Sequence, residues 1–231
     1  MTASEALARW ARFPVEREPR PVVLTELPMA ALEELAQDAE WRARFDGPGE
    51  PESALPPSLR PAAIDYCRDV QTASLQPLAT LLRAPAPFGT DRGIREFPAW
   101  LMHPPDRRWP FIAMEPEFRR RMTWWPEGLQ PYGEEVSRIA PDGHTLTYRF
   151  SGAPTPYADY PRAEVYESET AVFIEPIGVS LIGQDDAVLE YLEEREVVVR
   201  LAEPLGNRVL IWAAHGPDSD TFGAPRTVLP A

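Results

Sequence analysis

Apolar and polar residues alternate with a period of two through much of the second half of the chain, which predicts β-strands. Residues 136–140 (VSRIA) and 144–150 (HTLTYRF) are two such runs, and Pro141-Asp142-Gly143 lies between them. Proline fixes its φ angle, aspartate can accept hydrogen bonds from the backbone that follows it, and glycine tolerates positive φ. This tripeptide therefore predicts a hairpin turn between two antiparallel strands.

Two further pairs of runs have the same composition, and each predicts another hairpin. They are residues 163–166 with 171–182, and residues 196–202 with 208–214. Gly206, in the last connection, can take the left-handed conformation that a tight turn needs. Three successive hairpins imply an antiparallel sheet. We therefore predict an α+β fold, with N-terminal helices packed on a largely antiparallel sandwich or half-barrel that the second half forms.

The last pair of runs also carries a resemblance. In the string VVVRLAEPLGNRVLIWAAHG, with AEVYESETAV before it, the chain resembles the C-terminal part of uncharacterised proteins of GC-rich bacteria. The resemblance extends weakly to residues 20–24 and 90–100. Because no activity is known for that group, the resemblance implies no functional residue.

The first part of the chain favours helices. Apolar residues fall near helical spacing over residues 28–45, with glutamates early and arginines late, which predicts one helix. Ser58 is a candidate N-cap for a second helix, which resumes over residues 77–82 after a break at Pro77. We interpret Cys67, on the apolar face of that helix, as a small core residue rather than a nucleophile.

A change of composition near residue 90 suggests how the chain is organised. Residues 84–93 (APAPFGTDRG) predict a rigid loop, and two short strands are expected after it, at 94–102 and 109–114. We predict a mainly helical part over residues 1–90 and a β-rich part over residues 91–231, or one compact domain that contains both.

The basic residues exclude several chemistries. All 23 of them are arginine, so a phosphate-binding Walker lysine, a Schiff-base lysine and a kinase-type lysine are ruled out. A single cysteine excludes an intramolecular disulfide and a cysteine-rich zinc site. The sequence has neither an apolar signal segment nor a long apolar run, so we expect a cytoplasmic protein with no membrane partner.

No recognisable catalytic or metal motif is present. His103, His144 and His215 do not have the spacing of a metal-binding helix, and nucleotide-binding and serine-hydrolase motifs are missing. The acidic pairs Asp185-Asp186 and Asp218-Asp220 could hold a cation, although such pairs more often lie in solvated loops. We therefore predict no catalytic residue, no metal ligand and no cofactor.

The sharpest local anomaly is the segment FRRRMTWW. Its arginines Arg119, Arg120 and Arg121 and its tryptophans Trp124 and Trp125 could form a cation–π surface that binds an anionic ligand. The alternative is a helix or turn that buries one tryptophan while the arginines pair with acidic residues elsewhere.

The distribution of charge suggests a type of partner. Residues 144–231 carry a net charge of −8 out of the −13 of the whole chain. Such a field disfavours nucleic acid and favours basic proteins or cations. The alternative is that the acidity serves only to keep the protein in solution. The leading hypothesis is a non-enzymatic acidic binding or adaptor protein for a basic protein. The alternatives are an enzyme of an unrecognised family that binds an anionic small molecule near Arg119–Trp125, and a structural component of a larger assembly. The oligomeric state stays open.

Overall fold

The computed structural model describes residues 2–47, 49–68, 80–103, 109–127, 129, 136–182, 192–212 and 224–231. The chain forms two compact units that interleave along the sequence. The first unit contains Met1–Glu26, Gly89–Gly93 and Trp124–Ala231, and the second contains Leu27–Phe88 and Ile94–Thr123. The division into residues 1–90 and 91–231 stays a prediction.

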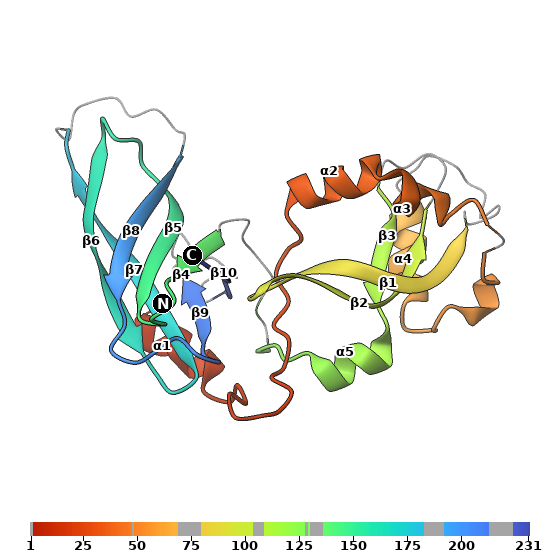
Figure 1. Ribbon diagram of the computed structural model, residues 1–231, viewed down its shortest axis with the longest axis horizontal. Helices are drawn as coiled ribbons and strands as arrows, with labels where there is room; N and C mark the ends of the chain where they lie inside the picture. The colour runs from red at the N-terminus through yellow and green to blue at the C-terminus, as the bar shows by residue number, and fades with distance from the viewer. Residues whose placement is uncertain are drawn as a thin grey trace. The chain divides into compact units, whose positions relative to one another are not determined.

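Two β-sheets form the centre of the first unit, and their strands can be followed in Figure 1. The strand order is β10-β4-β5-β8 in one sheet and β6-β7-β9 in the other. The strands are β4 (Val136–Ile139), β5 (Thr145–Gly152), β6 (Ala158–Glu167), β7 (Ala171–Ser180), β8 (Glu193–Arg200), β9 (Val209–Trp212) and β10 (Thr227–Pro230). Apolar side chains of both sheets, such as Leu146, Ile174 and Val199, are buried in one cluster.

Two of the three predicted hairpins are confirmed. Strands β4 and β5 pair antiparallel, as do β6 and β7. In the first turn Gly143 has a φ of 71°, and the Asp142 carboxylate accepts hydrogen bonds from the amides of His144 and Thr145, both at 2.8 Å. The hydrogen bonds from Thr145 and His144 lower the pKa of Asp142 to about 2. The turn is therefore held by an ionised carboxylate at neutral pH.

The third predicted hairpin is wrong. Strand β8 pairs antiparallel with β5, whereas β9 pairs parallel with β7 in the other sheet. The burial of the two strands gives the physical reason. The C-terminal half of β8 alternates between buried and exposed residues, which suits a strand with one solvent-exposed face, while all four residues of β9 are buried. Residues 202–208 thus cross from one sheet to the other, with Gly206 at a φ of 50°.

Helix α1 (Ala3–Trp10) covers the second face of the β6-β7-β9 sheet. Thr2 and Glu5 form a capping box at its start. Its buried residue Trp10 clusters with Phe173 of β7 and Ile211 of β9. Both faces of this sheet are therefore covered where β7 begins, which explains four consecutive buried residues at the start of that strand.

The segment Gly89–Gly93 is fixed in the first unit by Asp91. Its carboxylate, in a residue only 1% exposed, receives two hydrogen bonds from the Arg20 guanidinium, at 2.6 and 3.2 Å. The Asp91 amide donates to the carbonyl oxygen of Val23, and its carbonyl oxygen accepts from the Val228 amide, both at 3.0 Å. The N-terminal and C-terminal segments of the unit therefore meet at one buried residue.

The second unit contains a three-stranded sheet with helices on both faces. The strand order is β1-β2-β3. The two strands predicted at residues 94–102 and 109–114 are present as β2 and β3, and they pair antiparallel. The elements are α2 (Met29–Gln37), α3 (Ala39–Ala43), a 3-10 turn (Glu52–Ala54), α4 (Arg60–Arg68), β1 (Leu81–Thr90), β2 (Gly93–Met102), β3 (Phe111–Met114) and α5 (Pro116–Met122). In the view of Figure 1, α2 and α5 lie on opposite sides of the β1–β2 pair.

Two predictions for the second unit are wrong, and a third is confirmed in part. The expected loop over residues 84–93 is mostly strand β1, which also begins where the second helix was expected to resume. Because β1 is an edge strand, Pro85 and Pro87 can lie in it without removing a central ladder hydrogen bond. The helix expected over residues 28–45 is split at Asp38, whose extended backbone ends α2 and whose side chain caps α3.

The α+β fold class is confirmed, with helices concentrated in the first half and most of the strands in the second. Leu24 makes an isolated antiparallel bridge to Thr90. In the parts of the chain that the structure describes, no helix has the length and apolar character needed to cross a membrane.

The Arg20–Asp91 ion pair gives the first prediction. Replacement of Arg20 by alanine leaves a buried carboxylate for which Arg92, 3.9 Å away, is the remaining ion-pair partner among the residues that the structure describes. We expect the free energy of unfolding in urea to fall by about 2–4 kcal/mol. The matched control is Arg162→Ala on an exposed position of β6, which should change it by less than about 0.5 kcal/mol. Equal effects would contradict a central role for the pair.

Candidate functional site

A groove in the first unit lies between two connections of the sheets. The turn from β6 to β7 supplies Glu167, Ser168 and Glu169 on one side, and residues 202–208 supply the other. Val15 and Glu16 complete the lining, and the volume is about 700 Å³. We call this hollow the acidic groove.

Arg208 supports the acidic groove from inside. Its guanidinium donates to the Glu167 carboxylate at 2.7 Å and to the carbonyl oxygens of Ser168, Glu203 and Pro204 at 3.3, 2.6 and 3.0 Å. Arg208 is only 8% exposed. These contacts occupy the cation, so it is not available to neutralise the other carboxylates of the groove.

Glu167 is held as a carboxylate by the same network. Burial by itself would raise its pKa, but hydrogen bonds from the Ala202 amide, the Arg208 guanidinium and the Glu203 amide outweigh burial and lower it. The contacts from Ala202 and Arg208 are each 2.7 Å long. Glu167 is therefore ionised at neutral pH and is a structural acceptor rather than a proton donor.

Three further carboxylates of the groove face solvent. Glu16, Glu169 and Glu203 are all exposed and come from three separate segments of the chain. Within the described residues, none of these side chains makes an ion pair. The arrangement therefore presents net negative charge around a hollow that is wide enough for a side chain to enter.

A second hollow of about 810 Å³ shares Glu167 with the acidic groove. It is lined by Tyr166 and Glu175 and by the first turn of α1. The Tyr166 hydroxyl donates to the Glu164 carboxylate at 2.5 Å, and this hydrogen bond raises the pKa of Tyr166. The acidic character thus continues beyond the groove along β6 and β7.

The charge of the chain is concentrated in the unit that holds the groove. The first unit has 23 acidic residues and 12 arginines, a net charge of −11, and the second has 13 and 11, a net charge of −2. The acidity predicted for residues 144–231 therefore belongs to the unit built on the two facing sheets.

The structure separates the predicted arginines from the predicted tryptophans. Arg119, Arg120 and Arg121 are exposed on α5 in the second unit, whereas Trp124 and Trp125 are half-buried in the first. Within the described residues, neither Arg119 nor Arg120 makes an ion pair. These two arginines line a hollow of about 370 Å³ that also contains hydroxyl groups and no carboxylate.

The tryptophans meet two arginines that the sequence analysis missed. Arg9 and Arg12 line a hollow of about 510 Å³ together with Trp124 and Trp125. The signal was present in the stretch ARWARF at residues 8–13, where arginines alternate with aromatic residues, but it lies far from the tryptophans in sequence.

The other candidate residues have structural surroundings or lie outside the described residues. The His144 ring is 3.1 Å from the Leu201 carbonyl oxygen, and the His103 ring packs 5.3 Å from that of Phe45. His215, Asp185-Asp186, Asp218-Asp220 and the side chain of Cys67 lie outside the described residues. In the described parts of the chain, no three acidic, histidine or cysteine side chains gather as metal ligands would.

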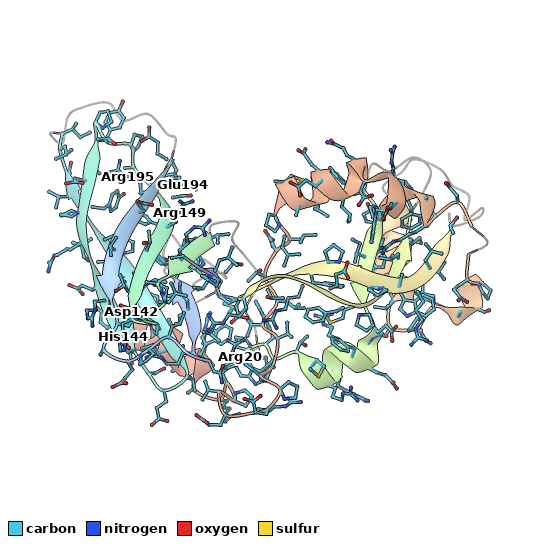
Figure 2. All side chains as sticks on the ribbon, in the orientation of Figure 1. Arg20, Asp142, His144, Arg149, Glu194 and Arg195 are labelled. Carbon is cyan, nitrogen blue, oxygen red and sulfur yellow. The ribbon has the colours of Figure 1, made fainter. Side chains whose placement is uncertain are left out.

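Charges on the outer face of β5 and β8 compensate one another. Arg149 of β5 lies 3.4 Å from Glu194 and 3.7 Å from Glu196, both on β8. Figure 2 shows Arg149 and Glu194 together, with Asp142 and His144 toward the other end of the sheet. This face therefore offers less uncompensated charge than the acidic groove.

Comparison with known proteins identifies no relative, since no family model, curated protein or solved structure matches the chain. The resemblance to uncharacterised proteins of GC-rich bacteria stays a prediction.

The lowered pKa of Glu167 predicts a dependence of stability on pH. A carboxylate whose pKa is lowered by folding stabilises the protein above its ordinary pKa of 4.5, and this contribution is lost as pH falls through its folded-state value. We expect Glu167→Gln to lower the free energy of unfolding by about 1–2 kcal/mol at pH 7. In urea denaturation, the difference in the free energy of unfolding between the variant and the native protein should disappear as pH falls below 4.5. A difference that is independent of pH would contradict this assignment.

Proposed function

We propose that this protein is a non-enzymatic binding protein that holds a basic protein partner at the acidic groove. The observation that carries the proposal is the set of exposed carboxylates Glu16, Glu169 and Glu203 around the groove. The arginine in the lining, Arg208, is already paired with Glu167. Arginine or lysine side chains of a partner can supply the missing positive charge.

The field of the whole unit supports the same partner. A net charge of −11 attracts a basic protein over distances of about 8–10 Å at ordinary salt and raises its rate of association. The pocket then adds selectivity, because carboxylates from three separate segments can contact a guanidinium from different directions.

The state of Glu167 supports binding rather than catalysis at this groove. A general acid or base works best when its pKa lies near the working pH. The pKa of Glu167 is displaced downward, away from neutrality, by hydrogen bonds that also tie the carboxylate to Arg208. Its role is therefore to shape the groove.

A peptide titration tests the proposal. An octa-arginine peptide should bind the native protein with an affinity that falls as salt rises, as measured by calorimetry. The triple variant Glu16→Gln, Glu169→Gln, Glu203→Gln should bind about tenfold or more weakly. The matched control replaces Glu34, Glu96 and Glu117 by glutamine, on exposed positions of the second unit. It removes the same charge and should bind within about twofold of the native protein.

The control variant also defines the result that would contradict the proposal. An equal loss of affinity in both triple variants would show a general charge effect and contradict a role for the groove. If the groove acts as proposed, a basic protein captured in stoichiometric amount from a native lysate should be lost in the groove variant and kept in the control.

A second candidate function rests on Arg119 and Arg120. Both guanidinium groups are exposed without an ion pair in the described residues, and their hollow also contains the Ser58 hydroxyl. The Thr123 hydroxyl in the same hollow already donates to the Arg119 carbonyl oxygen at 2.7 Å. This donor-rich arrangement favours a small anion. It would make the protein a receptor or enzyme for an anionic small molecule.

Thermal shift with pyrophosphate tests this second function. Pyrophosphate should raise the melting temperature of the native protein, and Arg119→Ala with Arg120→Ala should abolish the rise with little change in the melting temperature without ligand. The control, Arg42→Ala with Arg95→Ala, removes two exposed arginines of the same unit and should keep the rise. Loss of the rise in both variants would contradict a site on α5.

A further inference from the structure

A second kind of pocket lies on the first unit, at the junction of α1 and the segment that begins at Trp124. Its lining includes Arg12, Trp124, Trp125 and Glu127, and its volume is about 510 Å³. We call it the tryptophan pocket. It carries arginine and indole side chains, so its chemistry is opposite to that of the acidic groove.

The indole rings of the pocket are fixed by the aromatic cluster beneath them. Trp10 is fully buried, and its ring centre lies 5.3 Å from that of Trp124 and 6.3 Å from that of Trp125. The Phe13 ring meets Trp124 edge-on at 5.4 Å. The Trp125 indole N–H donates to the Leu129 carbonyl oxygen at 2.7 Å. The walls are therefore organised before any ligand arrives, which lowers the entropic cost of binding.

The pocket also offers hydrogen-bond donors. Arg12 is exposed, and within the described residues its guanidinium makes no ion pair or hydrogen bond. The indole N–H of Trp124 likewise has no hydrogen-bond acceptor among the residues that the structure describes. Both groups can donate to an oxygen anion, and a guanidinium binds a carboxylate through two parallel hydrogen bonds.

We propose that the tryptophan pocket binds a small carboxylate with an aromatic or apolar body. The carboxylate pairs with Arg12, and the body lies against the two indole rings, which provide a large apolar surface. The volume is in the range of small-molecule sites. The lining carries two arginines, Arg9 and Arg12, against one carboxylate, Glu127, so it offers one net positive charge, and the net charge of −11 on the unit disfavours polyanions. The ligand is therefore a monoanion.

This inference does not rest on the proposed function. The acidic groove and the tryptophan pocket share no lining residue. They also select ligands of opposite charge, so either site can fail its test without affecting the other.

The test uses 3-phenylpropionate as the probe and the indole N–H signals in two-dimensional NMR as the readout. The sequence has seven tryptophans, and the variants Trp124→Phe and Trp125→Phe assign the two signals that matter. Addition of the probe should move the Trp124 and Trp125 signals in a saturable manner. The uncharged analogue 3-phenylpropan-1-ol should bind at least about fivefold more weakly.

Single charge changes give the decisive comparison. Arg12→Ala should weaken binding about fivefold or more, while Glu127→Gln should tighten it about twofold because it removes a repulsive charge. The matched control, Arg162→Ala on β6, should leave the affinity unchanged. In each variant, unchanged chemical shifts of the indole N–H signals of the other tryptophans show that the protein is folded.

Three results would overturn the proposal. They are a titration that leaves the Trp124 and Trp125 signals in place, equal affinities for the carboxylate and the alcohol, and equal affinities of the Arg12→Ala and Arg162→Ala variants.

Discussion

The buried ion pair between Arg20 and Asp91 is the interaction on which the first unit depends most. It lies where three distant segments of the chain come together, because Asp91 also pairs through its backbone with Val23 and Val228. The Arg20 guanidinium donates in addition to the carbonyl oxygen of Asn207, in the connection that crosses between the sheets. A charge buried among backbone segments is tolerated only with matched partners. The ion pair therefore specifies one way of bringing these segments together.

The same crossing connection builds the acidic groove. Residues 202–208 must turn from the edge of one sheet to the other, and Arg208 stabilises this path by bonding to Glu167 and to carbonyl oxygens of the connection itself. The exposed carboxylates on the rim are thus held by a framework that uses its own positive charge internally. The tryptophan pocket follows the same principle with apolar contacts, since buried Trp10 supports rings that remain half-exposed.

The sequence predicted features that local chemistry controls. The turn at Pro141-Asp142-Gly143 was predictable because each residue favours it, and β6 and β7 were predictable from two apolar runs that flank the polar residues 167–170. The pairing of β8 could not be predicted from local chemistry, because a turn at Gly206 suits a hairpin and a crossing between sheets equally well and strand pairing is a tertiary property. The association of Arg12 with Trp124 could not be predicted, because it depends on where α1 packs, which is a tertiary property.

The interleaved course of the chain sets an order for folding during synthesis. Residues 27–123 contain the whole second unit together with the short segment that belongs to the first, so the second unit can form early. The first unit needs β10, which pairs with β4 and comes after the other strands of that sheet along the chain. Until β10 has been made, β4 lacks one neighbour and the shared cluster lacks Val228. A growing chain therefore exposes an incomplete sheet from the synthesis of β4 until that of β10.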